Sequence, residues 1–249
     1  DEITATDTDY KGYKTGFPHQ KINHLRFTTN NYFLLKNGTI NADFAFQNNK
    51  RKEFADATNP DEKELFFDLN TFNYNVRYNV KETNNWETSF GIGGMQQSNT
   101  NKGVEALIPD YQFFDAGAFV FTQKTFNKNL TLAGGLRFDN RNVDAKEMLE
   151  DTDVKFAKFN KNYSGISGSL GLSYQLDKQS TLKLNLSRGF RAPNIAELSS
   201  NGIHEGTFRY EIGDINLKSE ISHQIDAAYF LNSDHISFEF TPFVNFISN

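Results

Sequence analysis

One polar segment of the chain carries side chains whose chemistry suits the binding of a charged ligand. His204 has an imidazole, which in its neutral form is a good ligand for iron. Arg191 and Arg209 carry guanidinium groups that form paired hydrogen bonds with anions, and Phe208 and Tyr210 offer rings for stacking. The plainer interpretation is that a loop histidine is a solvated polar residue and that Arg191 packs the base of its own loop. The residue types alone leave both interpretations open.

Other chemistries find no support in the residue types or their spacing. The chain has no cysteine, which removes disulfides, thiolate metal sites and cysteine nucleophiles together. No two of the five histidines have the spacing of zinc ligands, and no glycine-rich phosphate-binding motif occurs. Serine and histidine residues cannot be joined into a catalytic triad from the sequence. We therefore expect no catalytic residue, no metal site and no resident cofactor.

The candidate segment follows a strand. Residues Leu182–Ser187 alternate leucine with polar residues, which is the period-two pattern of a strand between two different environments. The alternation stops at Gly189, and a long, charged, aromatic-rich stretch follows before a new alternating run begins near Glu220. This arrangement predicts a scaffold that holds up a binding surface.

The composition bounds the class of protein. The 249 residues include 25 Phe and 10 Tyr but one Trp, which favours strands over helices. Mean hydropathy is -0.61, and no stretch approaches the run of about 20 apolar residues that a membrane helix needs. A net charge of -5 gives no support to nucleic-acid binding. Residues Asp1–Thr4 lack the basic region and apolar core of a signal peptide, so we expect a mature chain or an excised fragment.

The alternating pattern recurs as five antiparallel pairs. Asn37-Gly38 predicts the first short hairpin turn, because this dipeptide supplies the positive φ that such turns require. A phase slip near Thr71 predicts a β-bulge in the third strand. Long loops are expected over residues 48–64, 96–110, 140–162 and 188–219. The ten expected strands cover residues 22–35 and 40–47, 65–80 and 86–93, 111–123 and 130–139, 166–176 and 182–187, and 221–231 and 236–244.

Three regularities define the expected fold class. Short turns and long loops alternate, so all short turns lie at one end of the strands. One face of the strands is apolar, and the other holds Asp43, Glu87, Arg137, Asp139, Lys183, Asp226 and Glu239. Aromatic residues gather beside the short turns, as Tyr78, Trp86, Tyr174 and Tyr229 show. Together these features predict an all-β protein, an antiparallel transmembrane β-barrel with lipid outside and a polar lumen.

A soluble β-sandwich or solenoid is the alternative, because apolar and polar residues also alternate along its strands. Sandwich strands usually have about five or six residues, and the expected strands are longer. Ten strands in an open sheet would leave two unpaired edges, which lipid does not tolerate. We therefore expect the chain to be part of a larger barrel.

The end of the strand at residues 182–187 resembles a motif of a known family. The segment Ser187–Leu198 looks like the FRAP box of TonB-dependent outer-membrane receptors, followed by a Glu-Leu pair. Gly135–Asp139 is similar to the recurrent G-L-R-Y/F-D strand ending of the same family. The residues that carry the FRAP box are Phe190, Arg191, Ala192 and Pro193.

A second motif follows in the order that the family shows. Gly213–Glu220 resembles the N/D-P-N-L-x-x-E box that opens the next strand, with Ile215 where the family usually has proline. The intervening Asn201–Gly213 is similar to a loop of receptors from Bacteroidetes-type bacteria. The residues that carry the second box are Asp214, Asn216 and Leu217.

The resemblance implies a 22-stranded barrel in the cell outer membrane, with long loops extracellular. It implies an N-terminal plug and energy passed on by the TonB–ExbB–ExbD complex, which acts through the plug. Neither a plug nor a TonB box is visible in the sequence, so residues 1–249 are expected to be a partial barrel domain. Outer-membrane lipid is the expected surrounding, with no nucleic-acid partner.

The resemblance also suggests the cargo. We expect uptake of an iron complex, with a siderophore slightly preferred over haem, and a glycan or cobalamin behind both. In haem receptors of the family a histidine between the two boxes ligates haem, and His204 lies in that interval. Arg191, Phe208, Arg209 and Tyr210 are the candidate contacts for an anionic siderophore. The alternative function is a structural or adhesive all-β surface protein, and an enzyme has no positive support.

Overall fold

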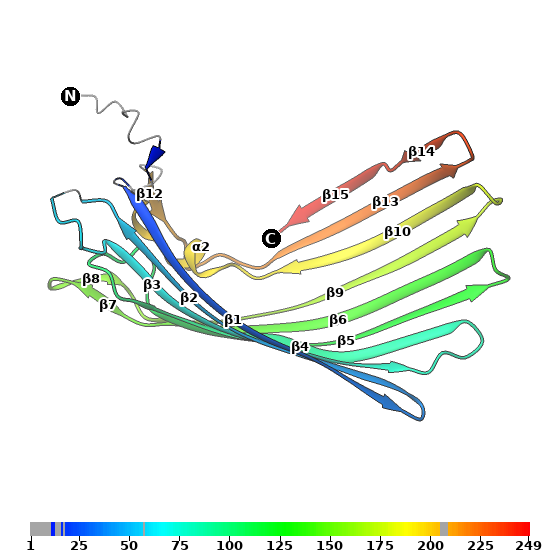
Figure 1. Ribbon diagram of the computed structural model, residues 1–249, viewed down its shortest axis with the longest axis horizontal. Helices are drawn as coiled ribbons and strands as arrows, with labels where there is room; N and C mark the ends of the chain where they lie inside the picture. Colours follow the sequence, from blue (N-terminus) through cyan, green and yellow to red (C-terminus); the bar gives the residue numbers. More distant parts are fainter. Residues whose placement is uncertain (1–10, 13–15, 17, 57, 205–208) are drawn as a thin grey trace.

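Long strands form one curved antiparallel sheet (Figure 1). The computed structural model describes residues 11–12, 16, 18–56, 58–204 and 209–249. No helix among these residues is long and apolar enough to cross a membrane. In sheet order the strands are β1 (His19–Leu35), β2 (Gly38–Phe54), β3 (Leu65–Val80), β4 (Trp86–Asn101), β5 (Tyr111–Phe126), β6 (Leu130–Ala145), β9 (Phe159–Gln175), β10 (Ser180–Arg191), β13 (Glu220–Asn232) and β14 (Ser237–Phe240), with β15 (Phe243–Ser248) also beside β13.

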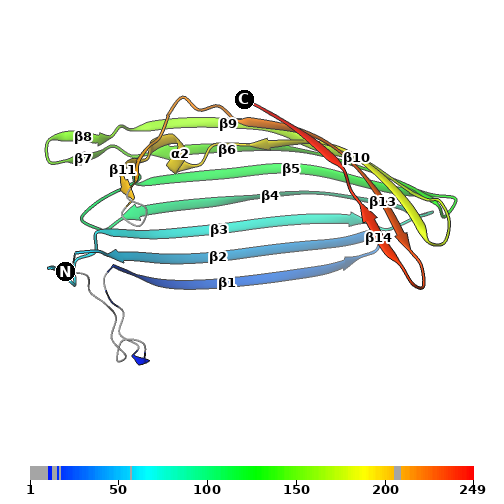
Figure 2. The ribbon, with the colours of Figure 1, turned by 90° about the horizontal axis from the view of Figure 1, so that it is seen from above.

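The ten predicted strands and their order are confirmed, with one of them split in two. β14 and β15 are one continuous pairing partner of β13, since Tyr229 faces Phe240 and Asp226 faces Phe243 without a shift of register. Pro242 lies in the gap between them, and proline has no N–H to donate to a strand ladder. β1 and β14–β15 form the two edges, so the sheet is an open section of barrel wall (Figure 2).

The short turns all lie at one end of the sheet and the long connections at the other (Figure 1). Two of the tight turns use residues in the left-handed region: Asn84 and Asn85 have φ of 53° and 58°, and Asn127 and Lys128 have φ of 47° and 62°. Two consecutive positive φ values give the turn whose twist matches that of the flanking strands. These turns hold adjacent strands in register.

The strands are longer at the loop end than the sequence predicted. The chain expected as loop at 48–64, 96–110 and 140–162 is partly strand, because β2 continues to Phe54, β4 to Asn101 and β6 to Ala145. The connections that remain are 55–64, 102–110, 146–158 and 192–219. The prediction was wrong there because the apolar alternation stops before the backbone ladder does.

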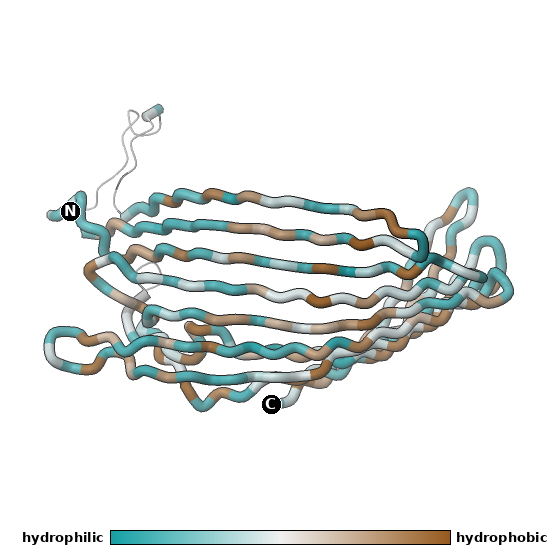
Figure 3. The backbone as a smooth tube through the Cα atoms, turned by 90° about the horizontal axis from the view of Figure 1, so that it is seen from below, coloured by the Kyte–Doolittle hydropathy of each residue, from teal (hydrophilic) through white to brown (hydrophobic). Residues whose placement is uncertain are grey.

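Figure 3 shows the hydropathy of each residue along the strands. On the outer face, the residues change from apolar to polar toward the loop end of each of these strands. Residues paired across strands share a face, so the register assigns each side chain to the outer or inner surface. On the outer face beyond Phe46, the side-chain amide of Asn48 donates to Asp68 and Asn70, both at 2.9 Å. Farther round the wall, Asn140 donates to Asn162 at 2.9 Å. Paired amides of this kind mark where the apolar belt ends.

The bulge expected near Thr71 is absent from the described pairing of β3. Its register with β2 runs without a shift from Glu53 and Leu65 to Gly38 and Val80. The apolar residues change face instead: Phe72 lies on the outer face, whereas Leu69 lies on the inner face. The phase slip in the sequence therefore arises because the apolar side chains of β3 lie on the outer face within the belt and on the inner face above it.

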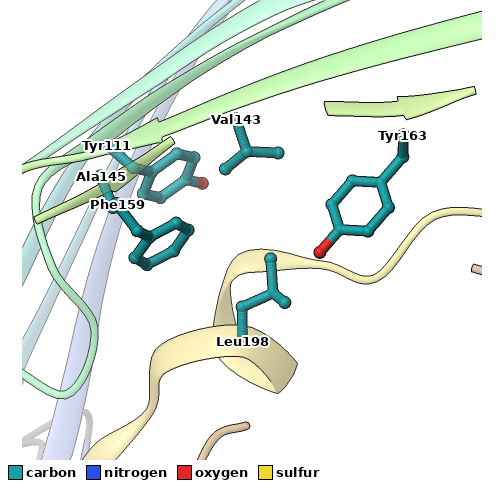
Figure 4. Close-up of a cluster of buried hydrophobic side chains, with 6 residues drawn as sticks. All are labelled: Tyr111, Val143, Ala145, Phe159, Tyr163 and Leu198. Carbon is teal, nitrogen blue, oxygen red and sulfur yellow. The ribbon is translucent and has the colours of Figure 1, made fainter. Parts of the chain in front are cut away.

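The inner face carries an apolar cluster at the loop end of the sheet (Figure 4). Six side chains form it, and each is at most 8% exposed. Five come from β5, β6 and β9, and the sixth comes from the short helix α2 (Ile195–Ser199). They are Tyr111, Val143, Ala145, Phe159, Tyr163 and Leu198. The cluster fixes the helix to the inside of the wall.

Candidate functional site

The first motif folds into the end of β10 and a helix that follows at once. Asn194 caps α2: its Oδ1 accepts from the Glu197 backbone N–H at 2.9 Å, and the Glu197 carboxylate accepts from the Asn194 N–H at 2.8 Å. This reciprocal capping box satisfies two backbone donors that a helix N-terminus leaves free. Pro193 precedes the cap and prevents β10 from continuing as a donor strand.

Two apolar side chains of the motif fasten it to the wall. Leu198 is 2% exposed within the apolar cluster, and Phe190 packs against the edge of the same cluster. The Phe190 ring lies over Gly165 of β9, where a Cβ would come 2.1 Å from a ring carbon. Any larger residue at position 165 would clash with the Phe190 ring, so glycine is needed there for the ring to pack against β9.

The second motif closes on the first through the backbone. The Gly213 N–H donates to the Ser200 carbonyl oxygen at 2.8 Å, and the Asp214 N–H donates to the Glu197 carbonyl oxygen at 2.8 Å. Any Cβ at 213 would lie 2.3 Å from the Ser199 nitrogen, so only glycine allows this approach. We call residues 190–200 and 213–220 together the loop bracket.

The rest of the second motif forms a turn and returns to the wall. The Asp214 carboxylate accepts from the Asn216 N–H at 2.8 Å, which is an Asx turn. The Leu217 carbonyl oxygen accepts from the Tyr163 hydroxyl at 3.2 Å. The bracket therefore has fixed contacts with β9 on both of its arms.

Arg191 joins the two arms by charge. Its Nε donates to Glu220 at 2.7 Å, and its Nη1 donates to both Glu197 oxygens at 2.9 Å. The hydrogen bond from the Arg191 guanidinium holds the pKa of the Glu220 carboxyl below its usual range. Arg191 and Glu220 both lie at the loop ends of their strands. The guanidinium of Arg191 is thus engaged by the bracket itself.

The bracket carries a small hairpin of β11 (Asn201–His204) and β12 (Arg209–Ile212). His204 and Arg209 are the last described backbone partners of these two strands, whereas Phe208 lies outside the described residues. Arg209 is exposed, and Tyr210 is 60% exposed with its hydroxyl donating to Asn201 Oδ1 at 2.6 Å. The structure thus places Arg191 at the base of the loop and His204, Arg209 and Tyr210 on the hairpin above it.

Neighbouring loops support the base of this hairpin. The Asn201 backbone N–H donates to the Leu107 carbonyl oxygen at 3.1 Å, and its side-chain amide donates to the Lys155 carbonyl oxygen at 3.1 Å. The short hairpin of β7 (Met148–Glu150) and β8 (Asp153–Phe156) supplies the second contact. A groove of about 550 Å³ lies between these loops and Tyr210, so the described hairpin borders a concave surface at the mouth of the wall.

Below the bracket, the inner face carries charged pairs that the sequence had only in part singled out. Asp115 and Arg141 form a bidentate pair at 2.7 and 2.6 Å, next to the Arg137 and Asp139 pair at 2.8 Å. A cavity of about 280 Å³ lies among these four residues, with Arg191 at its rim. Asp115 and Arg141 lie on the same inner face as Arg137 and Asp139. Extending the alternation of the two strands by one more pair of residues would have predicted their position from the sequence.

No group of three or more His, Cys, Asp or Glu side chains in the described part of the chain is arranged to hold a metal ion. The described bracket and hairpin instead offer an exposed guanidinium and phenol at the mouth, with paired charges beneath. Such an arrangement can bind an anionic ligand by hydrogen bonds and stacking.

An antiparallel wall with an apolar outer belt, a charged inner face and tight turns at one end defines a transmembrane β-barrel protein. The sequence model of the family described as "TonB dependent receptor-like, beta-barrel" matches residues 2–249, and the chain belongs to this family of outer-membrane transport receptors.

Relatives agree with this assignment. The chain is 24% identical over 192 residues to the TonB-dependent heme receptor A of Haemophilus influenzae, covering 70% of this chain and 25% of the relative. The copper transporter OprC superposes with a TM-score of 0.71 at 17% identity, covering 92% of this chain and 38% of that one. The siderophore receptor PirA from Pseudomonas aeruginosa gives 0.67 at 17% identity, covering 91% and 39%. The chain spans about a quarter of the curated relative's length.

Proposed function

We propose that the receptor carrying this chain takes up an iron complex, a ferric siderophore or haem, with energy supplied through TonB. The observation that carries the proposal is the loop bracket, which carries the β11–β12 hairpin and borders a charged inner cavity. Family membership supports transport, and relatives named for heme and for a siderophore support an iron complex as cargo.

The described residues suit the first steps of uptake. Arg209 and Tyr210 would contact a cargo anion at the mouth, and His204 would ligate iron if the cargo is haem. Arg137 and Arg141, each paired with a carboxylate, would line the way below. The TonB–ExbB–ExbD complex would act through a plug region, and residues 1–249 would contribute wall and mouth to the barrel.

The difference between the two ends of the strands supports one orientation in the outer membrane. The apolar belt would lie in lipid, the short turns would face the periplasm, and the long loops would be extracellular. The paired outer-face amides of Asn48, Asn140 and Asn162 support this orientation, because they extend the wall beyond the hydrocarbon on the loop side.

A pair of arginine substitutions on one face of β6 tests the position of the belt. Leu136→Arg puts a charge in the apolar belt and should cost about 2–4 kcal/mol of unfolding free energy, whereas Asn142→Arg, above the belt, should cost about 0–1 kcal/mol. Both positions lie on the outer face. Urea unfolding of the receptor in lipid vesicles measures the two values. Equal costs at the two positions would contradict the proposed placement in the membrane.

The cargo is tested by growth under iron starvation. A strain lacking this receptor should fail to grow on haem, or on one particular ferric siderophore, as the sole iron source. Growth on that source should return with the intact gene, should again fail without TonB, and should be normal on free ferrous iron throughout. Normal growth of the deletion strain on every iron complex, combined with lost surface attachment, would favour the adhesive alternative.

A further inference from the structure

The outer face of the wall is hollowed where β6, β9, β10 and β13 meet. The hollow has a volume of about 750 Å³, within the usual range of about 300–1,000 Å³ for ligand sites. Gly134 and Gly168 lie on its floor and contribute no side chain. Its walls are exposed aliphatic side chains, with Leu136 62% and Leu170 67% exposed. The other apolar side chains that line the hollow are those of Val120, Ile166, Leu186 and Ile225.

One end of this hollow is cationic. Arg188 and His223 are cross-strand partners, so their side chains share the outer face at the edge of the hollow. The Arg188 guanidinium donates to the Ile166 carbonyl oxygen, and it has no ion-pair partner within the described residues. None of the described residues that line the hollow is acidic. A permanent positive charge therefore faces outward without an anion from the chain.

The position of this charge along the strand matters. On β10 the outward-facing run of Leu182, Leu184 and Leu186 ends at Arg188. On neighbouring β9 the outer face changes from Ile166 to Ser164 in the same direction. Arg188 thus lies near the border of the apolar belt, at the depth where the headgroups of lipids meet their acyl chains.

We propose that this hollow binds a membrane lipid with an anionic phosphate headgroup. Leu170 and Leu136 fold over Gly134 and Gly168, and an acyl chain would lie against these and the other aliphatic side chains of the hollow, which supply apolar contact. The phosphate would accept hydrogen bonds from Arg188, with His223 beside it. The lipid site is separate from the loop bracket and faces the opposite surface of the wall.

The test uses the purified intact receptor and two lipids with identical acyl chains, anionic phosphatidylglycerol and zwitterionic phosphatidylcholine. Native mass spectrometry of equimolar mixtures measures their relative binding. The wild-type receptor should prefer phosphatidylglycerol about tenfold, and Arg188→Gln should reduce the ratio to near one. Gly134→Leu should reduce binding of both lipids, because it fills the hollow toward Leu170.

Lys124→Gln is the matched control, since Lys124 is an outer-face cation that lies over Trp86 and does not line the hollow. It should keep the wild-type preference. The proposal is overturned if the wild-type receptor shows no preference, if Lys124→Gln loses as much as Arg188→Gln, or if folded Gly134→Leu receptor binds both lipids normally. A retained β-sheet circular dichroism spectrum and retained cargo uptake establish that each variant is folded.

Discussion

Replacing Leu198 with aspartate should release the loop bracket from the wall. The side chain is 2% exposed among Tyr111, Val143 and Phe159, so a carboxylate there would be buried without a partner. Truncating a buried leucine alone costs about 2–5 kcal/mol, and the unpaired charge adds to that cost. Local opening is the cheaper response, because the ten wall strands keep their own ladders.

Limited proteolysis of the intact receptor measures this opening. Cleavage within residues 192–219 should become at least tenfold faster, and cargo binding should fall with it, while the barrel resists denaturation by detergent as before. Leu198→Met is the matched control, since a swap of similar volume usually costs less than about 1.5 kcal/mol. Unchanged cleavage in the aspartate variant would show that the apolar cluster does not anchor the bracket.

Replacing His204 with alanine should separate the two proposed cargoes. If the cargo is haem, the imidazole at the end of β11 is the expected iron ligand, and its loss should abolish haem-dependent growth. If the cargo is a siderophore, held by Arg209 and Tyr210, growth on the ferric siderophore should fall less than about threefold, because no hydrogen bond to a charged group is lost. Growth curves with each iron source measure both outcomes.

His235→Ala provides the control for that experiment, because His235 lies in the short turn between β13 and β14, at the other end of the strands. It should leave growth on either source unchanged. Full haem-dependent growth of the His204→Ala strain would refute haem ligation by this residue.

Most of the wall could be predicted from the sequence. Alternation with a period of two identifies a strand wherever its faces meet lipid and lumen, so the belt from Leu130 to Phe138 was found without the structure. Above the belt both faces are polar or mixed, and the pattern fades although the ladder continues through Ala145. Around Leu69 and Phe72 the apolar residues move from one face of β3 to the other. In a sequence, this change of face gives the same break in alternation as a β-bulge.

The loop bracket was less accessible to sequence reasoning. The two motifs marked its ends, but the contact between them is made by the backbone of Gly213 and Asp214, which leaves no side-chain pattern. In the sequence, Leu198 is a single leucine in a polar stretch, and no local pattern predicts its burial. Its burial depends on side chains from β5, β6 and β9, which are distant in the sequence. The roles of His204, Phe208, Arg209 and Tyr210 in binding stay predictions.

Arg191 and Glu220 are cross-strand partners, so the chain leaves the wall and re-enters it at adjacent points. Everything between them is an insertion whose ends are already held together. Lengthening such an insertion costs little, since each doubling of loop length adds only about 0.6 kcal/mol of closure entropy. The segment between Arg191 and Glu220 can therefore vary in length at little entropic cost to the wall on either side of it.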